Sequence, residues 1–122
     1  MNLSFTDLDL GGKLAAASDA ELELAPFGVV RMNGDSKVTL FNRRESEISG
    51  LSAARVLGKH FFEDVAPCTN NHKVAHRFDQ PAPIDELVDY VFTYRLAPTP
   101  VKLRLIKDQE GRRYMLVQPR AS

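Results

Sequence analysis

The chain has 122 residues, of which 43% are hydrophobic, and this is enough to build one domain around one apolar core. Sixteen basic and sixteen acidic residues cancel, so the net charge gives no indication of binding to nucleic acid or to an anionic membrane. The single cysteine excludes an internal disulfide and a zinc site of several cysteines, and it indicates a reducing, cytoplasmic compartment.

The first 25 residues are acidic and are interrupted by Gly11 and Gly12. They lack the basic and continuously apolar regions of a signal peptide, and no stretch of the chain is apolar for long enough to span a membrane. We therefore expect residues 1–25 to form a short helical N-terminal cap, followed by one main domain at residues 26–122.

Two apolar runs, 27–32 and 37–42, flank the sequence Asn33-Gly34-Asp35-Ser36. This pattern predicts a β-hairpin in which Gly34 supplies the positive φ that a tight turn needs.

Helical segments are expected in the middle of the chain. Gly50 and Gly58 divide residues 43–67 into short helical pieces, with Ser52 as a candidate N-cap. Residues 69–78 predict one helix, capped by Thr69 or Asn70 and carrying apolar side chains four residues apart.

The last third of the chain changes to a period of two. Apolar and polar residues alternate in 88–96 and in 101–106, and a third strand is predicted at 114–118. The order of elements predicts an α+β fold with a five-stranded antiparallel sheet and helices on one face. It resembles the order found in PAS domains, which enclose a pocket between the sheet and the central helices.

The stretch 41–69 carries a more specific resemblance. Its signature is "GK.FF.DVAPCT" at residues 58–69, preceded by "N..E..I.G", which places Glu45 upstream of Cys68. Both motifs resemble those of the photoactive yellow protein family of small blue-light receptors with a PAS fold. The similarity extends to residues 26–30, 89–102 and 114–117.

The resemblance implies a covalent chromophore. In that family the motif cysteine carries p-coumaric acid as a thioester, so Cys68 would be the attachment residue. The family's buried glutamate, here Glu45, donates a hydrogen bond to the phenolate, and Ser49 holds the position of a threonine in the same network. The implied pocket is lined by Val30, Phe61, Val65, Ala66, Thr69, Phe92 and Tyr94.

The chain departs from the family pattern at three pocket positions. Phe41 replaces a tyrosine that donates a second hydrogen bond to the phenolate, and phenylalanine cannot donate. Leu51 replaces an arginine that shields the chromophore ring, and Leu96 replaces a methionine. The first departure predicts a raised phenol pKa, because one charge-assisted hydrogen bond is missing.

The residues alone leave alternatives open at the two principal positions. Cys68 precedes a predicted helix, whose N-terminus would favour the thiolate needed for acylation, but it could equally be a small packing residue. Glu45 lies on the apolar side of a predicted helix, with Arg43 and Glu47 pairing outside, and burial would keep its carboxyl neutral. The alternative is a surface glutamate paired with Arg44.

Other functions receive less support from the sequence. Cys68, His72 and His76 follow a Cys-x3-His-x3-His spacing that could hold zinc, but only if all three lie within one helix. Tyr90, Phe92 and Tyr94 could stack on bases, although the absence of a basic groove favours a place in the core. No catalytic constellation is present, so an enzyme is not expected.

We therefore expect a blue-light photoreceptor. Light would isomerise the chromophore, Glu45 would give up its proton, and segment 1–25 would loosen and be read by a separate signalling protein. The alternative is a chromophore-free PAS module that senses a ligand or binds a protein. We expect a monomer or weak dimer.

Overall fold

A computed structural model describes residues 2–93 and 98–120. The helices are α1 (Leu10–Ala16), α2 (Asp19–Glu23), α3 (Arg43–Ser49) and α4 (Ala53–Val56), with a π-helical turn at Phe61–Val65 and 3₁₀ turns at Pro67–Thr69 and Ala75–Asp79. The strands are β1 (Gly28–Met32), β2 (Val38–Phe41), β3 (Ile84–Phe92), β4 (Thr99–Lys107) and β5 (Arg113–Pro119).

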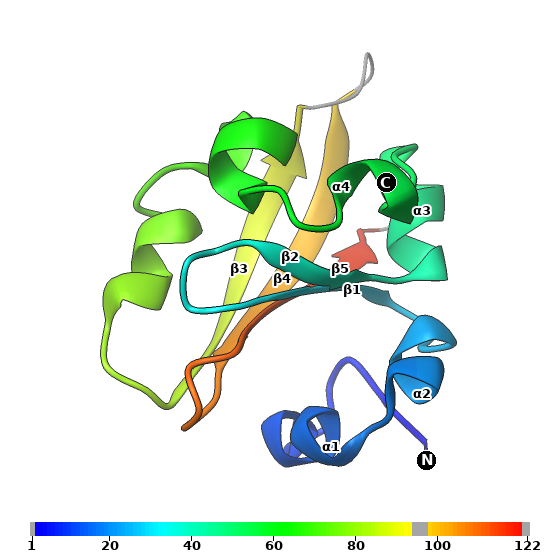
Figure 1. Cartoon of the computed structure of the whole chain (residues 1–122), viewed down its shortest axis with the longest axis vertical. Coiled ribbons are helices and arrows are strands. Elements are labelled where there is room, and N and C mark those ends of the chain that lie inside the picture. The colour runs from blue at the N-terminus through cyan, green and yellow to red at the C-terminus, as the bar shows by residue number, and fades with distance from the viewer. Residues whose placement is uncertain (1, 94–97, 121–122) are drawn as a thin grey trace.

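The five strands form one antiparallel sheet in the order β2-β1-β5-β4-β3 (Figure 1). This confirms the predicted α+β architecture and the predicted hairpin of β1 and β2. In that hairpin Val30 lies opposite Phe41 and Met32 lies opposite Val38. A register shift between Arg31 and Met32 lets Val38 and Phe41 face the same side of the sheet, although they are three positions apart in the sequence.

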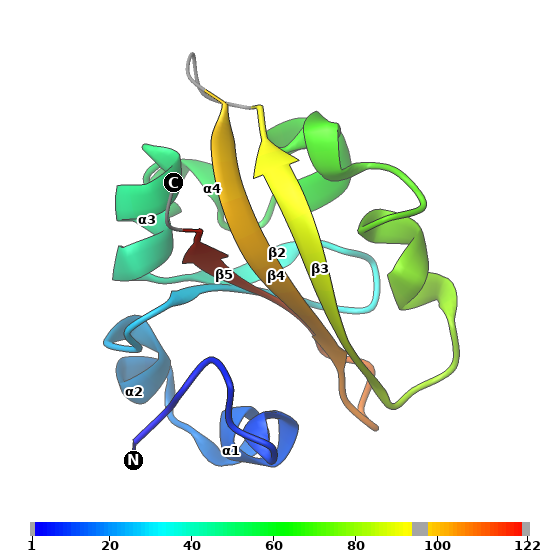
Figure 2. The ribbon, with the colours of Figure 1, turned by 180° about the vertical axis from the view of Figure 1, so that it is seen from behind.

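Strands β1 and β5 are buried on both faces, because their side chains alternate between two apolar cores. Val30, Met115 and Val117 belong to a central core, under the helical segments that follow β2. Val29, Tyr114 and Leu116 belong to a second core, which we call the cap core, under the N-terminal segment. Figures 1 and 2 show α1 and α2 on one side of the sheet, with α3 and α4 on the other.

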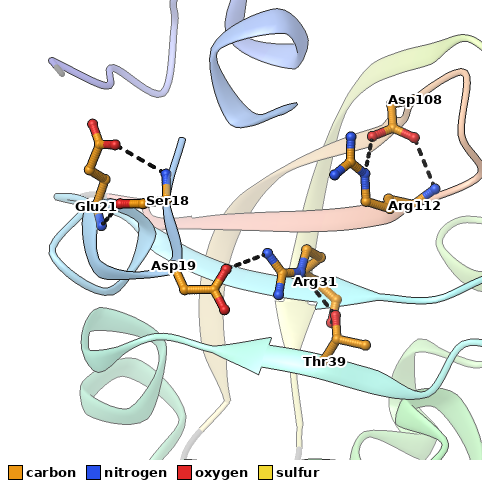
Figure 3. A network of polar contacts seen from close by, with 7 residues as sticks. All are labelled: Ser18, Asp19, Glu21, Arg31, Thr39, Asp108 and Arg112. Carbon is orange, nitrogen blue, oxygen red and sulfur yellow. Dashed lines mark hydrogen bonds and ion pairs between the residues drawn. The ribbon is translucent and has the colours of Figure 1, made fainter. Parts of the chain in front are cut away.

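The N-terminal segment shares the cap core with the sheet, since Leu10, Leu14 and Leu22 are fully buried there. Polar contacts add to this packing (Figure 3). Ser18 and Glu21 form a reciprocal capping box at the start of α2, and the Asp19 carboxylate accepts a hydrogen bond from Arg31 over 2.9 Å. The segment is therefore docked on the sheet, while its behaviour as a separable cap remains a prediction.

The tight turn between β1 and β2 differs from the prediction in one detail. The residue with positive φ is Ser36, at 61°, and not Gly34. The Asn33 side chain stabilises this turn, because its Oδ1 accepts from the backbone N–H groups of Asp35 and Lys37 over 2.9 and 3.0 Å.

The helix predicted at residues 69–78 is wrong. A 3₁₀ turn ends at Thr69, a second one covers Ala75–Asp79, and irregular turns connect them. Asn71 explains the break, because its Oδ1 accepts from the N–H groups of Lys73 and Val74, which competes with helical hydrogen bonding. The apolar side chains of this stretch are nevertheless buried in the central core.

Within the part of the chain that the structure describes, no helix has the length and apolar character needed to cross a membrane.

Candidate functional site

The central core brings together most of the predicted pocket. Buried in it are Val30, Phe41, Phe61, Ala66 and Phe92, and packed against it are Leu51, Val65 and Cys68. Buried polar side chains on the flanking elements are Glu45, Ser49 and Thr69. Tyr94 and Leu96 lie outside the described residues. The sequence motifs, which come from several separate elements, thus meet at one place in the fold.

Cys68 lies at the edge of this core. Its thiol forms no disulfide, the residue is partly exposed, and it is the middle of the 3₁₀ turn Pro67–Thr69. The fully buried Thr69 fixes the turn, since its hydroxyl donates to the Ala66 carbonyl over 2.7 Å. The expected position before a long helix is wrong, and a three-residue turn lacks the aligned peptide dipoles on which that argument depended.

Glu45 is fully buried on the inner side of α3. Asn42 caps this helix, and its Oδ1 accepts from the Glu45 N–H over 3.0 Å. The alternative of a surface glutamate paired with Arg44 is therefore wrong. On the outer side of α3 Glu47 pairs with Arg44 over 3.7 Å, and not with Arg43 as the sequence predicts.

Gly28 of β1 has no side chain, and this leaves space for the carboxyl of Glu45 between α3 and β1. A Cβ atom built on Gly28 would lie 2.4 Å from Oε1 of Glu45 and 3.2 Å from Cβ of Val117. No side chain can occupy that space while Glu45 keeps its position. Gly28 is thus the residue in the "PFGVV" stretch that permits the buried acid.

Three further predicted site residues lie close to Glu45 in the sequence. Phe41 is almost completely buried and brings no polar group to the core. The buried Ser49 hydroxyl accepts from the Leu51 N–H over 3.1 Å, which leaves its own proton available for donation. Leu51 packs against the central core and brings no positive charge to it.

Two polar residues near Cys68 were not among the predicted site residues. Tyr90 of β3 donates its hydroxyl to the main-chain carbonyl of Cys68, and Asn71 donates to the same oxygen over 3.1 Å. In the sequence, the alternation of β3 already indicates that Tyr90 lies on the same inner face as Phe92, and the two rings are in contact. This alternation was the sequence feature from which a role for Tyr90 in the site could have been inferred. Its contact with Cys68 depends on the path of residues 70–74, which the predicted helix misplaced.

The zinc-site and base-stacking interpretations lose support. Cys68, His72 and His76 do not lie in one helix, and no group of three metal-ligating side chains occurs among residues 2–93 and 98–120. Tyr90 and Phe92 pack in or against the central core and not on an open face of the sheet, as the preferred interpretation predicted.

Comparison with known proteins agrees with the fold and the site. Residues 18–117 match the PAS fold, so the chain is a PAS-domain protein. It is 37% identical to a photoactive yellow protein of Halochromatium salexigens over 81% of this chain and 82% of the relative. It is 32% identical to that of Cereibacter sphaeroides, over 86% of this chain and 85% of the relative. The chain belongs to the photoactive yellow protein family.

A solved structure supports the same assignment. The photoactive yellow protein domain of the sensor histidine kinase Ppr from Rhodospirillum centenum superimposes with a TM-score of 0.80 and 31% identity. The alignment covers 88% of this chain and 98% of that domain. In that protein a domain of this family is joined to a histidine kinase.

Proposed function

We propose that this protein is a blue-light photoreceptor in which Cys68 carries a p-coumaroyl group as a thioester. The observation that carries the proposal is that Cys68 packs against the central core, while the fully buried Glu45 lies beside Gly28, next to Val117 of the same core. The names of the relatives support it further, since proteins called photoactive yellow protein match most of this chain.

The side chains around Cys68 and Glu45 suit a p-coumaroyl group. Attachment requires a reduced, accessible thiol, and Cys68 is free and partly exposed. An aromatic acyl group requires apolar surroundings, which Phe61, Ala66 and Phe92 supply. A phenolic end group requires a hydrogen-bond donor, and burial favours the neutral form of a carboxyl, which can donate.

When bound, the p-coumaroyl group supplies absorption of blue light and a double bond that isomerises. In our proposal Glu45 first donates a hydrogen bond to the phenolate oxygen and then releases its proton to it. Loss of this proton leaves a carboxylate in an apolar core, and an uncompensated buried charge costs several kcal/mol. Leu51 offers no cation to offset that cost.

Hydrogen bonds of Asn42 support a proposed connection between Glu45 and the N-terminal segment. The Asn42 side chain binds the Glu45 N–H through Oδ1, and through Nδ2 it donates to the Leu22 carbonyl over 3.0 Å. Any shift of α3 that follows ionisation of Glu45 therefore strains a contact with α2. We propose that the segment 1–25 loosens and that a signalling partner reads the altered surface.

Reconstitution tests the proposal. The purified protein is mixed with p-coumaric anhydride, whose acyl carbon the Cys68 sulfur attacks while p-coumarate leaves and the thiol proton goes to solvent. We expect one added acyl group by intact mass, a visible band, and bleaching under blue light that reverses in the dark. Cys68→Ala should abolish the adduct.

Matched variants then test the role of the acid. Glu45→Gln should shift the visible band while attachment remains, whereas Glu47→Gln, on the outer side of α3, should leave the band unchanged. If the protein forms no adduct, or an adduct that does not bleach, the photoreceptor proposal fails. The chain would then be a chromophore-free PAS module for a ligand or a protein.

A further inference from the structure

The main-chain carbonyl of Cys68 is held by two side chains from separate parts of the chain. Tyr90 in β3 donates its hydroxyl to this oxygen, and Nδ2 of Asn71 donates to it over 3.1 Å. Nδ2 of Asn71 also donates to Oη of Tyr90 over 2.7 Å. The carbonyl, the hydroxyl and the amide therefore form a closed set of contacts.

The orientation of Asn71 is fixed by its other end. Its Oδ1 accepts from the backbone N–H groups of Lys73 and Val74, over 3.0 and 3.2 Å. Backbone N–H groups can only donate, so the atom facing them must be the oxygen. The NH₂ end of the amide must consequently face Cys68 and Tyr90.

The position of Tyr90 is fixed by the sheet. Tyr90 lies opposite Val101 in the ladder between β3 and β4, and its ring meets Phe92 edge-to-face with centroids 6.2 Å apart. Arg120 donates to the Tyr90 main-chain carbonyl over 3.1 Å. The hydroxyl is thus a fixed donor on the sheet, to which the Cys68 turn is attached.

We propose that Tyr90 and Asn71 are positioning residues that set the direction in which Cys68 presents its sulfur to the central core. A single 3₁₀ turn has little stability of its own, so these contacts replace the support that a long helix would give. The functional consequence rests on the proposed attachment at Cys68. With the carbonyl held, the sulfur keeps one direction relative to Glu45 and the surrounding apolar side chains.

The contact can be measured without any chromophore. Because Cys68 is the only cysteine, cysteine labelled with carbon-13 at its carbonyl marks a single peptide group for infrared spectroscopy. Tyr90→Phe keeps the ring and removes the hydroxyl, while Asn71→Asp keeps the acceptor and removes the donor. We expect the labelled amide band to move to higher frequency in both variants. Tyr114→Phe, which removes a hydroxyl in the cap core, should not move it.

The positioning role needs a second readout, which a purely structural contact would not affect. In chromophore-free protein we follow alkylation of Cys68 by iodoacetamide under native conditions. Loss of one hydrogen bond predicts a change of about two- to tenfold in this rate for Tyr90→Phe, against no change for Tyr114→Phe. In protein carrying the p-coumaroyl group, recovery of the bleached visible band in the dark should slow by a similar factor.

The outcomes separate the two proposals. An unmoved infrared band in Tyr90→Phe, or a moved band with unchanged alkylation, overturns the positioning role whether or not a chromophore binds. Failure of the unsubstituted protein to take up p-coumaroyl overturns the photoreceptor proposal alone. A moved band with a changed alkylation rate would still support positioning of the Cys68 sulfur.

Discussion

The side chain of Asn42 joins α2 to the helix that carries the buried acid, through a hydrogen bond from its Nδ2 to the Leu22 carbonyl over 3.0 Å. The same nitrogen donates to the Phe27 carbonyl over 3.0 Å. Its Oδ1 accepts from the N–H groups of Val29 and Glu45 over 2.9 and 3.0 Å. Both ends of this fully buried amide are therefore used, and α2, β1 and α3 meet there.

Replacing Asn42 should separate these elements. In Asn42→Ala the helix loses its N-cap and two buried carbonyls lose their donors, so we expect a loss of at least about 2 kcal/mol in the free energy of unfolding. Urea unfolding measures this loss. Ser52→Ala is the matched control, because Ser52 caps α4 without a side-chain hydrogen bond and should cost less than about 0.5 kcal/mol. Equal losses in the two variants would contradict the assigned role of Asn42.

Gly28→Ala tests the space in which Glu45 lies. The added methyl group would overlap Oε1 of Glu45, so either the carboxyl or α3 must move. We expect a loss of about 1–3 kcal/mol in the free energy of unfolding, and in reconstituted protein a displaced visible band. Gly34→Ala is the control, since a Cβ there meets nothing within 4 Å. A Gly28→Ala protein as stable as this control would show that Glu45 does not need the space.

The sequence predicted those parts of the fold that depend on local periodicity. Alternation in β3 predicted its buried face, since Val88 and Phe92 are buried, and the separation of α3 from α4 followed from Gly50, which adopts a φ of 78°. The path after Cys68 could not be predicted in this way. There the Asn71 side chain captures backbone N–H groups, and local propensity does not include such contacts.

The candidate site was predicted from motifs and not from physical patterns. Cys68 and Glu45 are distant in the sequence, and only the fold packs α3 and the region of the Pro67–Thr69 turn against the same central core. Tyr90 and Asn71 were missed because their importance lies in a contact with a main-chain carbonyl. A carbonyl has no sequence signature, so side-chain patterns could not reveal that contact.

Phe41→Tyr should restore a donor to the phenolate. A hydroxyl at this buried position would stabilise the ionised phenol by about 1.5–3 kcal/mol, which lowers the phenol pKa by about one to two pH units. Titration of the visible band in reconstituted protein measures the change. Phe41→Leu, which adds no donor, is the control and should not lower this pKa. A Phe41→Tyr titration that coincides with that of the unsubstituted protein would mean that residue 41 does not face the phenol.

Arg104 fixes the start of the N-terminal segment to β4. Its Nη1 donates to the main-chain carbonyls of Phe5 and Asp7 over 2.9 and 2.7 Å, and its Nε and Nη2 bind both oxygens of Asp85. The ammonium of Arg104→Lys cannot reproduce this planar set of donors. We expect a loss of about 1–3 kcal/mol in the free energy of unfolding, and faster proteolysis within residues 1–25.

The control for Arg104 lies on the same strand. Lys102 makes only an exposed pair with Asp89 over 3.8 Å, so Lys102→Ala should change stability by less than about 0.5 kcal/mol. Similar proteolysis of the N-terminal segment in Arg104→Lys and Lys102→Ala would contradict the role of Arg104.

Acid should loosen the N-terminal segment. The hydrogen bond from Arg31 lowers the pKa of Asp19, and the hydrogen bond from Lys13 lowers that of Asp7. A carboxyl with a lowered pKa binds fewer protons in the folded state, so its contribution to stability is complete above the unfolded pKa near 4 and is lost as the pH falls below it. We expect amide hydrogen exchange within residues 1–25 to accelerate, relative to β4, between about pH 5 and pH 3 once intrinsic rates are corrected. Asp19→Asn should already exchange faster at pH 5 and respond less to acid, and an unchanged acid response in that variant would exclude the Asp19 contact as a cause.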